Sequence, residues 1–212
     1  MQNLYVHYGC GLDAPNEWIN FDASPTFRIQ QIPILGNIVK KKLNVIFPPN
    51  VKFGNIVHGL PIASNSCAGV YCSHTLEHLS LQDFRQSLKN TLNILQKDGI
   101  FRCVVPDLEY AANLYIQQLN SGDEHASIHF IGNTTLLGIN QRPKGFKGLV
   151  TSLLGNSHHL WMWDAASLKK ELSNAGFTSI RTCTFNDCED KMFTYVEREG
   201  RFVNAVAIEC KK

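Results

Sequence analysis

The fold is decided by residues 7–22, which read "HYGCGLDAPNEWINFD". The apolar run that leads into this stretch predicts a short buried strand that ends at Gly9 and Gly11. A second short strand, "WINFD", follows and ends on Asp22. Glycine allows a tight turn and a close approach of a ligand to the backbone, and open α/β sheets bind ligands at the carboxyl ends of their strands. The stretch therefore predicts an α/β sheet with a ligand site after its first two strands.

The rest of the chain alternates strands with helices. Further strands are predicted in "VKFGNIVHGLP", "CAGVYCS", "GIFRCVVPD", "FTSIRTCTF" and "RFVNAVAIEC". Ser80 is suited to cap a helix that Gly99 ends, a second helix runs from Asp164 to Gly176, and a third covers residues 108–119. This alternation predicts a doubly wound, Rossmann-like seven-stranded sheet that is mostly parallel. The last two strands lack a helix-length connection, so we expect them to form an antiparallel pair at the C-terminal edge.

Length and composition fit one soluble enzyme-sized domain. The chain has 212 residues, 44% of them hydrophobic and 18% charged, with a net charge of +2. So weak a charge does not indicate a nucleic-acid partner, and no apolar run reaches the roughly 20 residues of a membrane helix. Seven cysteines without a CxxC pair indicate neither a disulfide framework nor a four-cysteine zinc site, so we expect a cytoplasmic protein. We expect one domain over residues 1–212, with a less regular, lid-like acceptor segment at about 120–160; oligomeric state stays open.

The glycines and Asp22 together point to a nucleoside cofactor. A carboxylate at the end of a second strand can accept hydrogen bonds from both hydroxyls of a ribose. The pattern lacks the third glycine of the dinucleotide fingerprint, which favours a cofactor without a pyrophosphate over NAD. S-adenosylmethionine (SAM) is one such cofactor. The alternative is a plain glycine turn beside a solvent-facing aspartate.

Several segments in order resemble the class I SAM-dependent methyltransferases. They are "GCGLDAPNEWINFDASP", "GNIVHGLPIASNSCAGVYCSHTLEHLS", "LKNTLNILQKDGIFRCVVPDLE", "HHLWMWDAASLKKELSNAGF" and "FVNAVAIECKK". The chain is most similar to the small predicted methyltransferases associated with polysaccharide or lipopolysaccharide biosynthesis. The resemblance implies that SAM is converted to S-adenosylhomocysteine while its methyl group passes to a small-molecule or glycan-precursor acceptor.

The resemblance also implies roles for individual residues. The cofactor residues are Gly9, Cys10 and Gly11 around the methionine part, Asp22 at the ribose, Asn55 and Ile56 at the adenine, and Ser73 and His74 near the methionine carboxylate and the reacting methyl group. Two positions depart from the family. His7 stands where many members carry an acid, and Asn55 replaces an aspartate, although an amide can still accept a hydrogen bond. A catalytically impaired binding module with the same fold therefore remains the alternative.

The stretch "CSHTLEHL", residues 72–79, contains an HxxEH pattern made by His74, Glu77 and His78. On one helix the two histidines would share a face and could hold a zinc ion, as in inverzincin peptidases. The strand-like "GVYCS" runs directly into the motif, so we expect His74 at the strand end and only His78 in a helical turn. We therefore expect no metal site, and a metal hydrolase is the remote alternative; a cation held by these three residues stays a minor interpretation.

A methyl transfer to oxygen is helped by a base that removes the hydroxyl proton. Histidine suits this task near neutral pH, and we expect His74 to be the first candidate and His159 the second. His159 lies in "SHHLWMWD", whose aromatic residues could stack on an acceptor or pack in the core. Asp107, after the fifth strand, is expected either to line the acceptor pocket or to cap the following helix.

Overall fold

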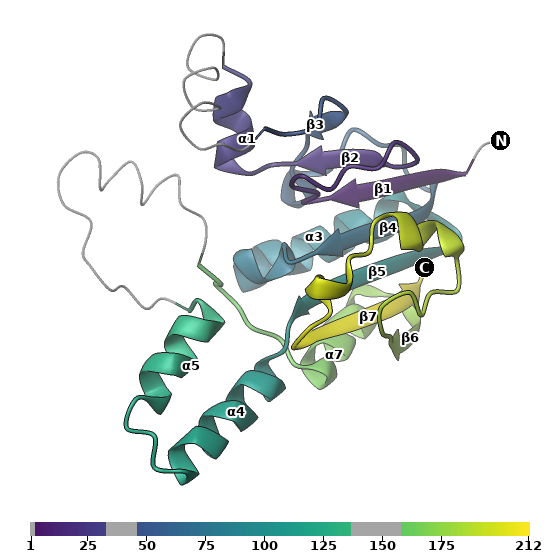
Figure 1. Ribbon diagram of the computed structural model, residues 1–212. Coiled ribbons are helices and arrows are strands. Elements are labelled where there is room, and N and C mark those ends of the chain that lie inside the picture. The colour runs from purple at the N-terminus through teal and green to yellow at the C-terminus, as the bar shows by residue number, and fades with distance from the viewer. Residues whose placement is uncertain (1–2, 33–45, 137–157) are drawn as a thin grey trace.

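The computed structural model describes residues 3–32, 46–136 and 158–212. Its strands are β1 (Leu4–Tyr8), β2 (Ile19–Asp22), β3 (Val51–Phe53), β4 (Cys67–Ser73), β5 (Leu95–Pro106), β6 (Thr178–Thr182) and β7 (Ala205–Lys211). They form one seven-stranded sheet in the order β3-β2-β1-β4-β5-β7-β6 (Figure 1). Neighbours from β3 to β5 are parallel, whereas β7 is antiparallel to both β5 and β6. The predicted sheet and its antiparallel edge pair are confirmed.

The functional edge of the sheet lies where β1, β2 and β4 end. The chain passes from β1 to β2 and β3 on one side, and then crosses to β4 on the other side of β1. Pairing aligns His7 of β1 with Asn20 of β2 and with Tyr71 of β4. The loops that follow these three parallel strands therefore meet at one edge. This is the switch point at which open α/β sheets bind ligands.

Helices α3 (Leu81–Ile94) and α7 (Ala165–Ala175) pack together over one face of the sheet. Their apolar residues recur at spacings of three and four, and Phe84, Leu88, Leu168 and Leu172 are all 0% exposed. Burial of each such side chain contributes about 1.5–3 kcal/mol. The predicted start of α3 at the Ser80 cap is confirmed, since the Ser80 side chain accepts a hydrogen bond from the main chain of its first turn.

The predicted end of α3 at Gly99 is wrong. The helix ends at Ile94 and β5 begins at Leu95, so Gly99 lies within the strand. A Cβ atom on Gly99 would lie 2.8 Å from the carbonyl oxygen of Cys67 on the neighbouring strand. The close approach of the two strands thus requires glycine at position 99. In the sequence alone, such a glycine looks the same as one that ends a helix. The predicted α7 end at Gly176 is confirmed, with φ of 104°.

The opposite face of the sheet is covered by the segment between β6 and β7. This segment contains the short 3-10 helices η3 (Lys191–Tyr195) and η4 (Glu199–Arg201). Phe193 of η3 is fully buried and contacts Trp18 edge-on, with ring centroids 5.3 Å apart. The indole nitrogen of Trp18 also donates to the main chain of Met192 at 3.1 Å.

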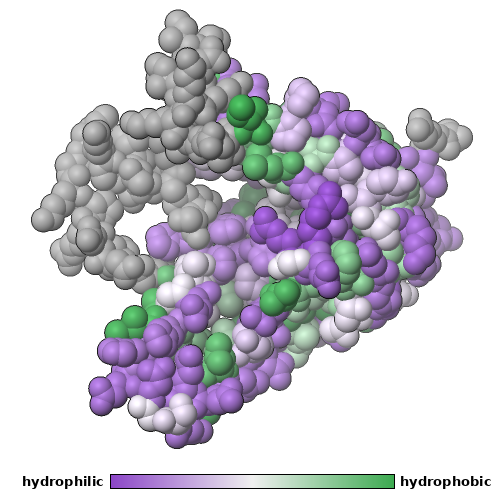
Figure 2. All heavy atoms as spheres, viewed as in Figure 1, coloured by the Kyte–Doolittle hydropathy of each residue, from purple (hydrophilic) through white to green (hydrophobic). Residues whose placement is uncertain are grey.

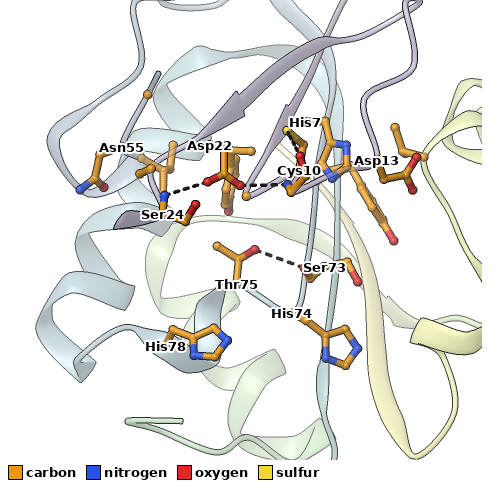
Figure 3. Close-up of a pocket in the computed structure, with 18 of the residues that line it drawn as sticks. His7, Cys10, Asp13, Asp22, Ser24, Asn55, Ser73, His74, Thr75 and His78 are labelled. Carbon is orange, nitrogen blue, oxygen red and sulfur yellow. Dashed lines mark hydrogen bonds between the residues drawn. The ribbon is translucent and has the colours of Figure 1, made fainter. Parts of the chain in front are cut away.

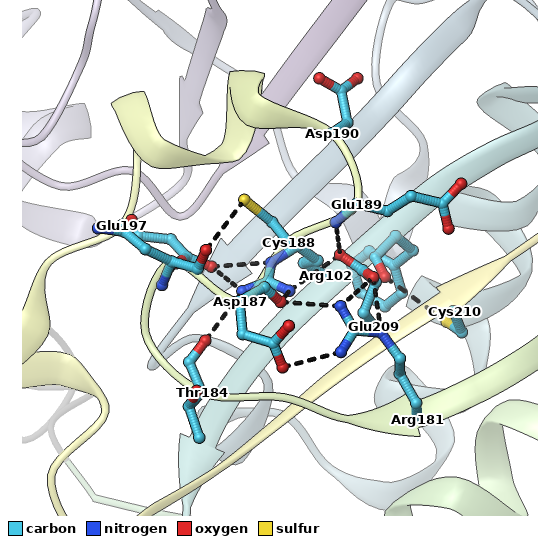
Figure 4. Close-up of polar contacts among 12 residues, drawn as sticks. Arg102, Arg181, Thr184, Asp187, Cys188, Glu189, Asp190, Glu197, Glu209 and Cys210 are labelled. Atoms are coloured by element: carbon cyan, nitrogen blue, oxygen red, sulfur yellow. Dashed lines mark hydrogen bonds and ion pairs between the residues drawn. The ribbon is translucent and has the colours of Figure 1, made fainter.

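A buried ionic cluster holds the same segment to the sheet (Figure 4). Arg102 on β5 is 1% exposed and pairs with Glu197, and its Nη1 also donates to Glu209 Oε2 at 2.9 Å. Nη1 makes a further bond of 2.8 Å to the carbonyl of Asp187. Arg181 closes the cluster by a 2.7 Å bond to Glu209 Oε1. Because removal of one partner leaves buried charges unpaired, this cluster fixes the path of the segment.

Helices α4 (Leu108–Asn120) and α5 (Ala126–Thr134) pack on each other and project away from the sheet (Figure 1). The predicted helix at 108–119 is confirmed, but α5 falls in the segment expected to be irregular. α4 buries none of its residues, and Figure 2 shows hydrophilic side chains with scattered apolar ones on this lobe. The apolar side chains exposed on it are Tyr110, Ile116, Leu119, Ile128 and Ile131. Residues 137–157 of the expected lid lie outside the described residues.

Helix α1 (Pro25–Gln30) and the short 3-10 helix η1 (Ile56–His58) flank the ends of β2 and β3. The Ser24 hydroxyl caps α1, and Pro25 begins it, as is typical of a first helical position. Across the described parts of the chain, no helix combines the length and the apolar character needed to cross a membrane.

Candidate functional site

A cavity of about 550 Å³ opens where β1, β2 and β4 end (Figure 3). Its volume lies within the range of small-molecule sites. All the residues expected at the cofactor line it: Gly9, Cys10, Gly11, Asp22, Asn55, Ile56, Ser73 and His74. The structure thus brings together residues that are far apart in the sequence.

Asp22 is the most firmly held polar group of this cavity. Its side chain is 4% exposed, and its two oxygens accept hydrogen bonds from Gly11 N at 2.9 Å and Ser24 N at 2.7 Å (Figure 3). Each carboxylate oxygen can accept a further hydrogen bond. The carboxylate is therefore fixed in orientation while it keeps capacity for two hydroxyl donors.

The loop after β1 contains Gly9 and Gly11, which differ in the space that a side chain would have. Both adopt left-handed backbone, with φ of 65° at Gly9 and 55° at Gly11. A Cβ on Gly9 would lie 2.1 Å from Thr75 Oγ1, whereas a Cβ on Gly11 would meet nothing within 4 Å. Gly9 thus allows the loop after β1 to touch the loop after β4. Only Gly11 leaves open space beside the cavity.

Cys10 and Asn55 contribute uncharged groups to the cavity. Burial and the charge of Asp22 raise the pKa of the Cys10 thiol to about 12, so the thiol stays protonated at neutral pH. The side-chain oxygen of Asn55 accepts a hydrogen bond from Val57 N at 2.9 Å and so begins η1. One lone pair of that oxygen remains for a ligand donor.

His7 is a buried neutral base in the wall of the cavity. It is 3% exposed, and its ring lies edge-on to Tyr71 with centroids 5.2 Å apart. Burial, aided by the charge of Arg198, lowers the pKa of His7 to about 3. Its Nδ1 has no hydrogen-bond partner among the described residues. His7 can therefore accept or donate a hydrogen bond, but it cannot supply the negative charge of an acid.

His74 and His78 do not lie on one helix, and the strand before His74 had led us to expect this. It follows β4 directly and has φ of 50°, whereas η2 covers only Leu76–His78. Its Nε2 lies 2.9 Å from the carbonyl oxygen of Arg201 and must donate to it, which leaves the lone pair on Nδ1. Burial lowers the pKa of His74, so the ring is neutral at neutral pH. The two-histidine clamp of a helical zinc peptidase is therefore not formed.

His159 lies beside the cavity rather than in it. Its ring contacts that of His78, which lines the cavity, with centroids 5.1 Å apart. Burial lowers the pKa of His159 to about 4, and the neighbouring His78 and His74 act in the same direction. In the same segment Trp163 packs on Phe84 at 4.2 Å and is 2% exposed, so this tryptophan belongs to the core.

Asp107 lies outside the large cavity. Its side chain accepts a hydrogen bond from Glu109 N at 2.8 Å and begins α4. It lines a separate, smaller cavity of about 160 Å³ between β5 and the α4–α5 lobe. Of the two roles expected for Asp107, its contacts support the capping of α4. The end of β5 lies further from the loops after β1 and β2 than the end of β4 does.

Two arginines at the cavity were not expected from the sequence. Arg198 and Arg201 reach it from η4 and the residue before it. Arg198 pairs with Asp13 at 2.6 Å, and Asp13 also lines the cavity. The arginines lie far from the glycine loop in sequence, and the Arg102 cluster brings their segment across the sheet. A sequence pattern at residues 198–201 alone could not have revealed this.

Comparison with known proteins agrees with this architecture. Residues 6–103 match the family model described as "Methyltransferase domain". That range runs from within β1 to within β5 and includes every residue expected at the cofactor. The match supports SAM as the cofactor. No curated protein sequence matches the chain significantly.

Several solved structures align with nearly the whole chain. A SAM-dependent methyltransferase from Archaeoglobus fulgidus aligns with a TM-score of 0.50 and 15% identity, over 99% of this chain and 86% of that one. The CurJ carbon methyltransferase aligns with a TM-score of 0.50 and 13% identity, over 99% of this chain and 48% of that one. A Thermotoga maritima SAM-dependent methyltransferase, a possible histamine N-methyltransferase, has a TM-score of 0.49, 16% identity and coverages of 100% and 83%. At these identities the first two alignments indicate a shared fold and no more.

Proposed function

We propose that the chain is a SAM-dependent methyltransferase, formed by a single domain over residues 1–212, that transfers a methyl group to an oxygen atom of a small molecule or glycan precursor. The observation that carries the proposal is the position of Asp22. Its carboxylate is held by two main-chain amides, faces a cavity of about 550 Å³, and lies at the switch point of the sheet. This is the placement that a ribose-binding acid needs in an open α/β sheet.

The cofactor residues then have distinct tasks. Asp22 accepts the ribose hydroxyls, Asn55 and Ile56 bind the adenine, and Ser73 lies near the methionine part. Gly9, Cys10 and Gly11 provide the backbone of the loop that faces the same part. When bound, SAM supplies an electrophilic methyl group on its sulfur. The chain's own contribution is to hold the acceptor in line with that methyl group and to remove the hydroxyl proton.

We assign the proton acceptor first to His74. Its ring lines the cavity and is neutral, because burial lowers its pKa. The lone pair lies on Nδ1, 3.5 Å from Glu77 Oε1, since Nε2 donates to the Arg201 carbonyl. The hydroxyl proton is therefore received at Nδ1. His159, whose Nδ1 has no hydrogen-bond partner among the described residues, is the second candidate.

The test is turnover with SAM and a panel of sugars, nucleotide sugars and hydroxylated metabolites, followed as S-adenosylhomocysteine release. His74→Ala should lower turnover by about 10²–10⁴-fold, the usual contribution of a positioned base. Its affinity for S-adenosylhomocysteine should change little. His58→Ala is the matched control, because His58 is exposed on η1 and does not line the cavity. Unchanged turnover of His74→Ala, with normal cofactor affinity, would remove the base assignment.

A specific observation also favours a second function, a binding module without catalysis. His7 occupies the position of an acid in many relatives of this fold, and burial keeps it neutral. A neutral ring holds the amino group of the cofactor less strongly than a carboxylate. Tight cofactor binding without turnover on any acceptor in the panel would favour this module. Methyl transfer to any acceptor excludes it.

A further inference from the structure

We propose that Glu77, His78 and His159 form a binding site for one divalent transition-metal ion, of which Zn²⁺ is the representative. The residues come from two segments, η2 after β4 and the segment that leads into α7. Each offers one ligand atom, and these atoms lie within 4.8 Å of one another. The proposal differs from the expectation of no metal site, and its ligand set differs from the HxxEH pattern because His159 takes the place of His74.

The two segments are held together by main-chain contacts at this point. The carbonyl of Glu77 accepts hydrogen bonds from Leu160 N at 2.8 Å and from Trp161 N at 3.1 Å. The His78 ring is bonded to the carbonyl of His158 at 3.1 Å. The side chains therefore meet because of a built contact between segments, and not through chance proximity on a surface.

Buried polar atoms at this point lack hydrogen-bond partners in the part of the chain that the structure describes. Glu77 is 0% exposed, and neither of its carboxylate oxygens accepts a hydrogen bond from another described residue. The ring nitrogens nearest to its Oε1 are His74 Nδ1 at 3.5 Å and His78 Nε2 at 3.8 Å, both beyond the usual hydrogen-bond distance. Nδ1 of His159 is also buried and has no hydrogen-bond partner within residues 3–32, 46–136 and 158–212. A buried carboxylate without a partner is costly, and a coordinated cation removes that cost.

The orientation of His78 is the one that a metal-binding histidine adopts. Its Nδ1 must donate to the His158 carbonyl, so the lone pair lies on Nε2, which faces Glu77. Histidines that bind metals commonly donate their other ring nitrogen to a backbone carbonyl in this way. His74 repeats the arrangement, since Nε2 donates to Arg201 and Nδ1 faces Glu77.

The donor set selects the class of metal. Imidazole nitrogens suit Zn²⁺ and similar transition metals, whereas Mg²⁺ and Ca²⁺ prefer oxygen ligands. Two histidines and one glutamate match the ligand types of three-ligand zinc sites, which keep a further position for water, substrate or a fourth side chain. Zinc holds such ligands at about 2.0–2.2 Å, so binding requires small rotations that draw the three side chains together.

The experiment uses the untagged full chain, stripped of metal and titrated with Zn²⁺ against a chromophoric chelator. We expect one ion per chain, and replacement by Co²⁺ should give the visible bands of a four- or five-coordinate site with nitrogen ligands. Glu77→Gln and His159→Ala should each weaken zinc binding at least about a hundredfold. His158→Ala is the matched control, because it keeps the main-chain carbonyl that holds His78 and removes only the neighbouring ring.

Two results would overturn the site: absence of stoichiometric zinc in the folded wild-type chain, or equal zinc affinity in His159→Ala and His158→Ala. Thermal unfolding of the metal-free variants shows whether each one folds, and the Co²⁺ spectrum of the wild-type chain decides the question if a variant does not. The site does not depend on methyl transfer. Titration of S-adenosylhomocysteine into the same wild-type sample separates the two proposals, since either ligand can bind without the other.

Discussion

Replacement of Asp22 by asparagine tests the cofactor site at its most firmly held group. The carboxylate accepts one main-chain hydrogen bond on each oxygen, from Gly11 and from Ser24. Asparagine has a single acceptor oxygen, so one of these amides then faces an NH₂ group. A hydrogen bond to a charged group contributes about 1.5–3 kcal/mol. Asp22→Asn should therefore lower the free energy of unfolding by about that amount.

The same substitution should weaken cofactor binding, because the ribose hydroxyls lose a charged acceptor. A loss of about 1.5–3 kcal/mol corresponds to roughly ten- to a hundredfold in the dissociation constant. Calorimetric titration with S-adenosylhomocysteine measures the loss of affinity, and urea unfolding measures the loss in free energy of unfolding. Asp83→Asn is the control, since Asp83 lies on α3 away from the cavity. An affinity of folded Asp22→Asn within twofold of the wild type would refute the ribose-binding role.

Three further predictions concern the frame of the site. Gly9→Ala should cost about 2–5 kcal/mol in free energy of unfolding, because the new Cβ would lie 2.1 Å from Thr75 Oγ1 in left-handed backbone. Gly11→Ala should cost only about 1–2 kcal/mol, because no described atom lies within 4 Å of its new Cβ. Equal losses in free energy of unfolding for the two variants, measured by urea unfolding, would contradict the clash at Gly9. Arg102→Met should cost about 3–5 kcal/mol, since it leaves the buried Glu197 without its arginine partner, although Glu209 keeps its pair with Arg181. Arg85→Met removes only a surface pair and should cost far less, and a small loss for Arg102→Met speaks against the anchoring role. The pKa of His7 is lowered from 6.5 to about 3, so its contribution to stability is complete above pH 6.5 and is lost as the pH falls towards 3. Against His7→Gln, the wild-type free energy of unfolding should fall more steeply in that window, by up to about 1.4 kcal/mol per pH unit, and parallel pH curves would show that His7 is not buried in neutral form.

The strands and most helix ends could be predicted from local patterns. Short apolar or β-branched runs mark the seven strands, and the caps at Ser80 and Asp164 mark the starts of α3 and α7. Gly99 was misread because a glycine that lets two strands approach looks like a glycine that ends a helix. α5 was missed because its sequence, "ASIHFIGNT", is short and lacks a strong cap or an apolar stripe.

The cofactor side of the site follows from the chain order of its motifs, whereas the rest depends on tertiary contacts. Gly11 and Asp22 could be placed together, because the ends of neighbouring parallel strands meet at one edge. Arg198 reaches the cavity only because the Arg102 cluster directs a long segment across the opposite face of the sheet. His159 reaches Glu77 through main-chain bonds made by the two residues that follow it, Leu160 and Trp161. No spacing rule within one helix could reveal such a meeting.

Calorimetric titration of the folded wild-type chain with S-adenosylhomocysteine asks directly whether the cavity binds the cofactor. We expect one site per chain with a dissociation constant on the order of micromolar. In the same titration, Asp22→Asn should bind at least about tenfold more weakly. No binding at millimolar S-adenosylhomocysteine, in a chain that is shown to be folded, would exclude a SAM site in this cavity.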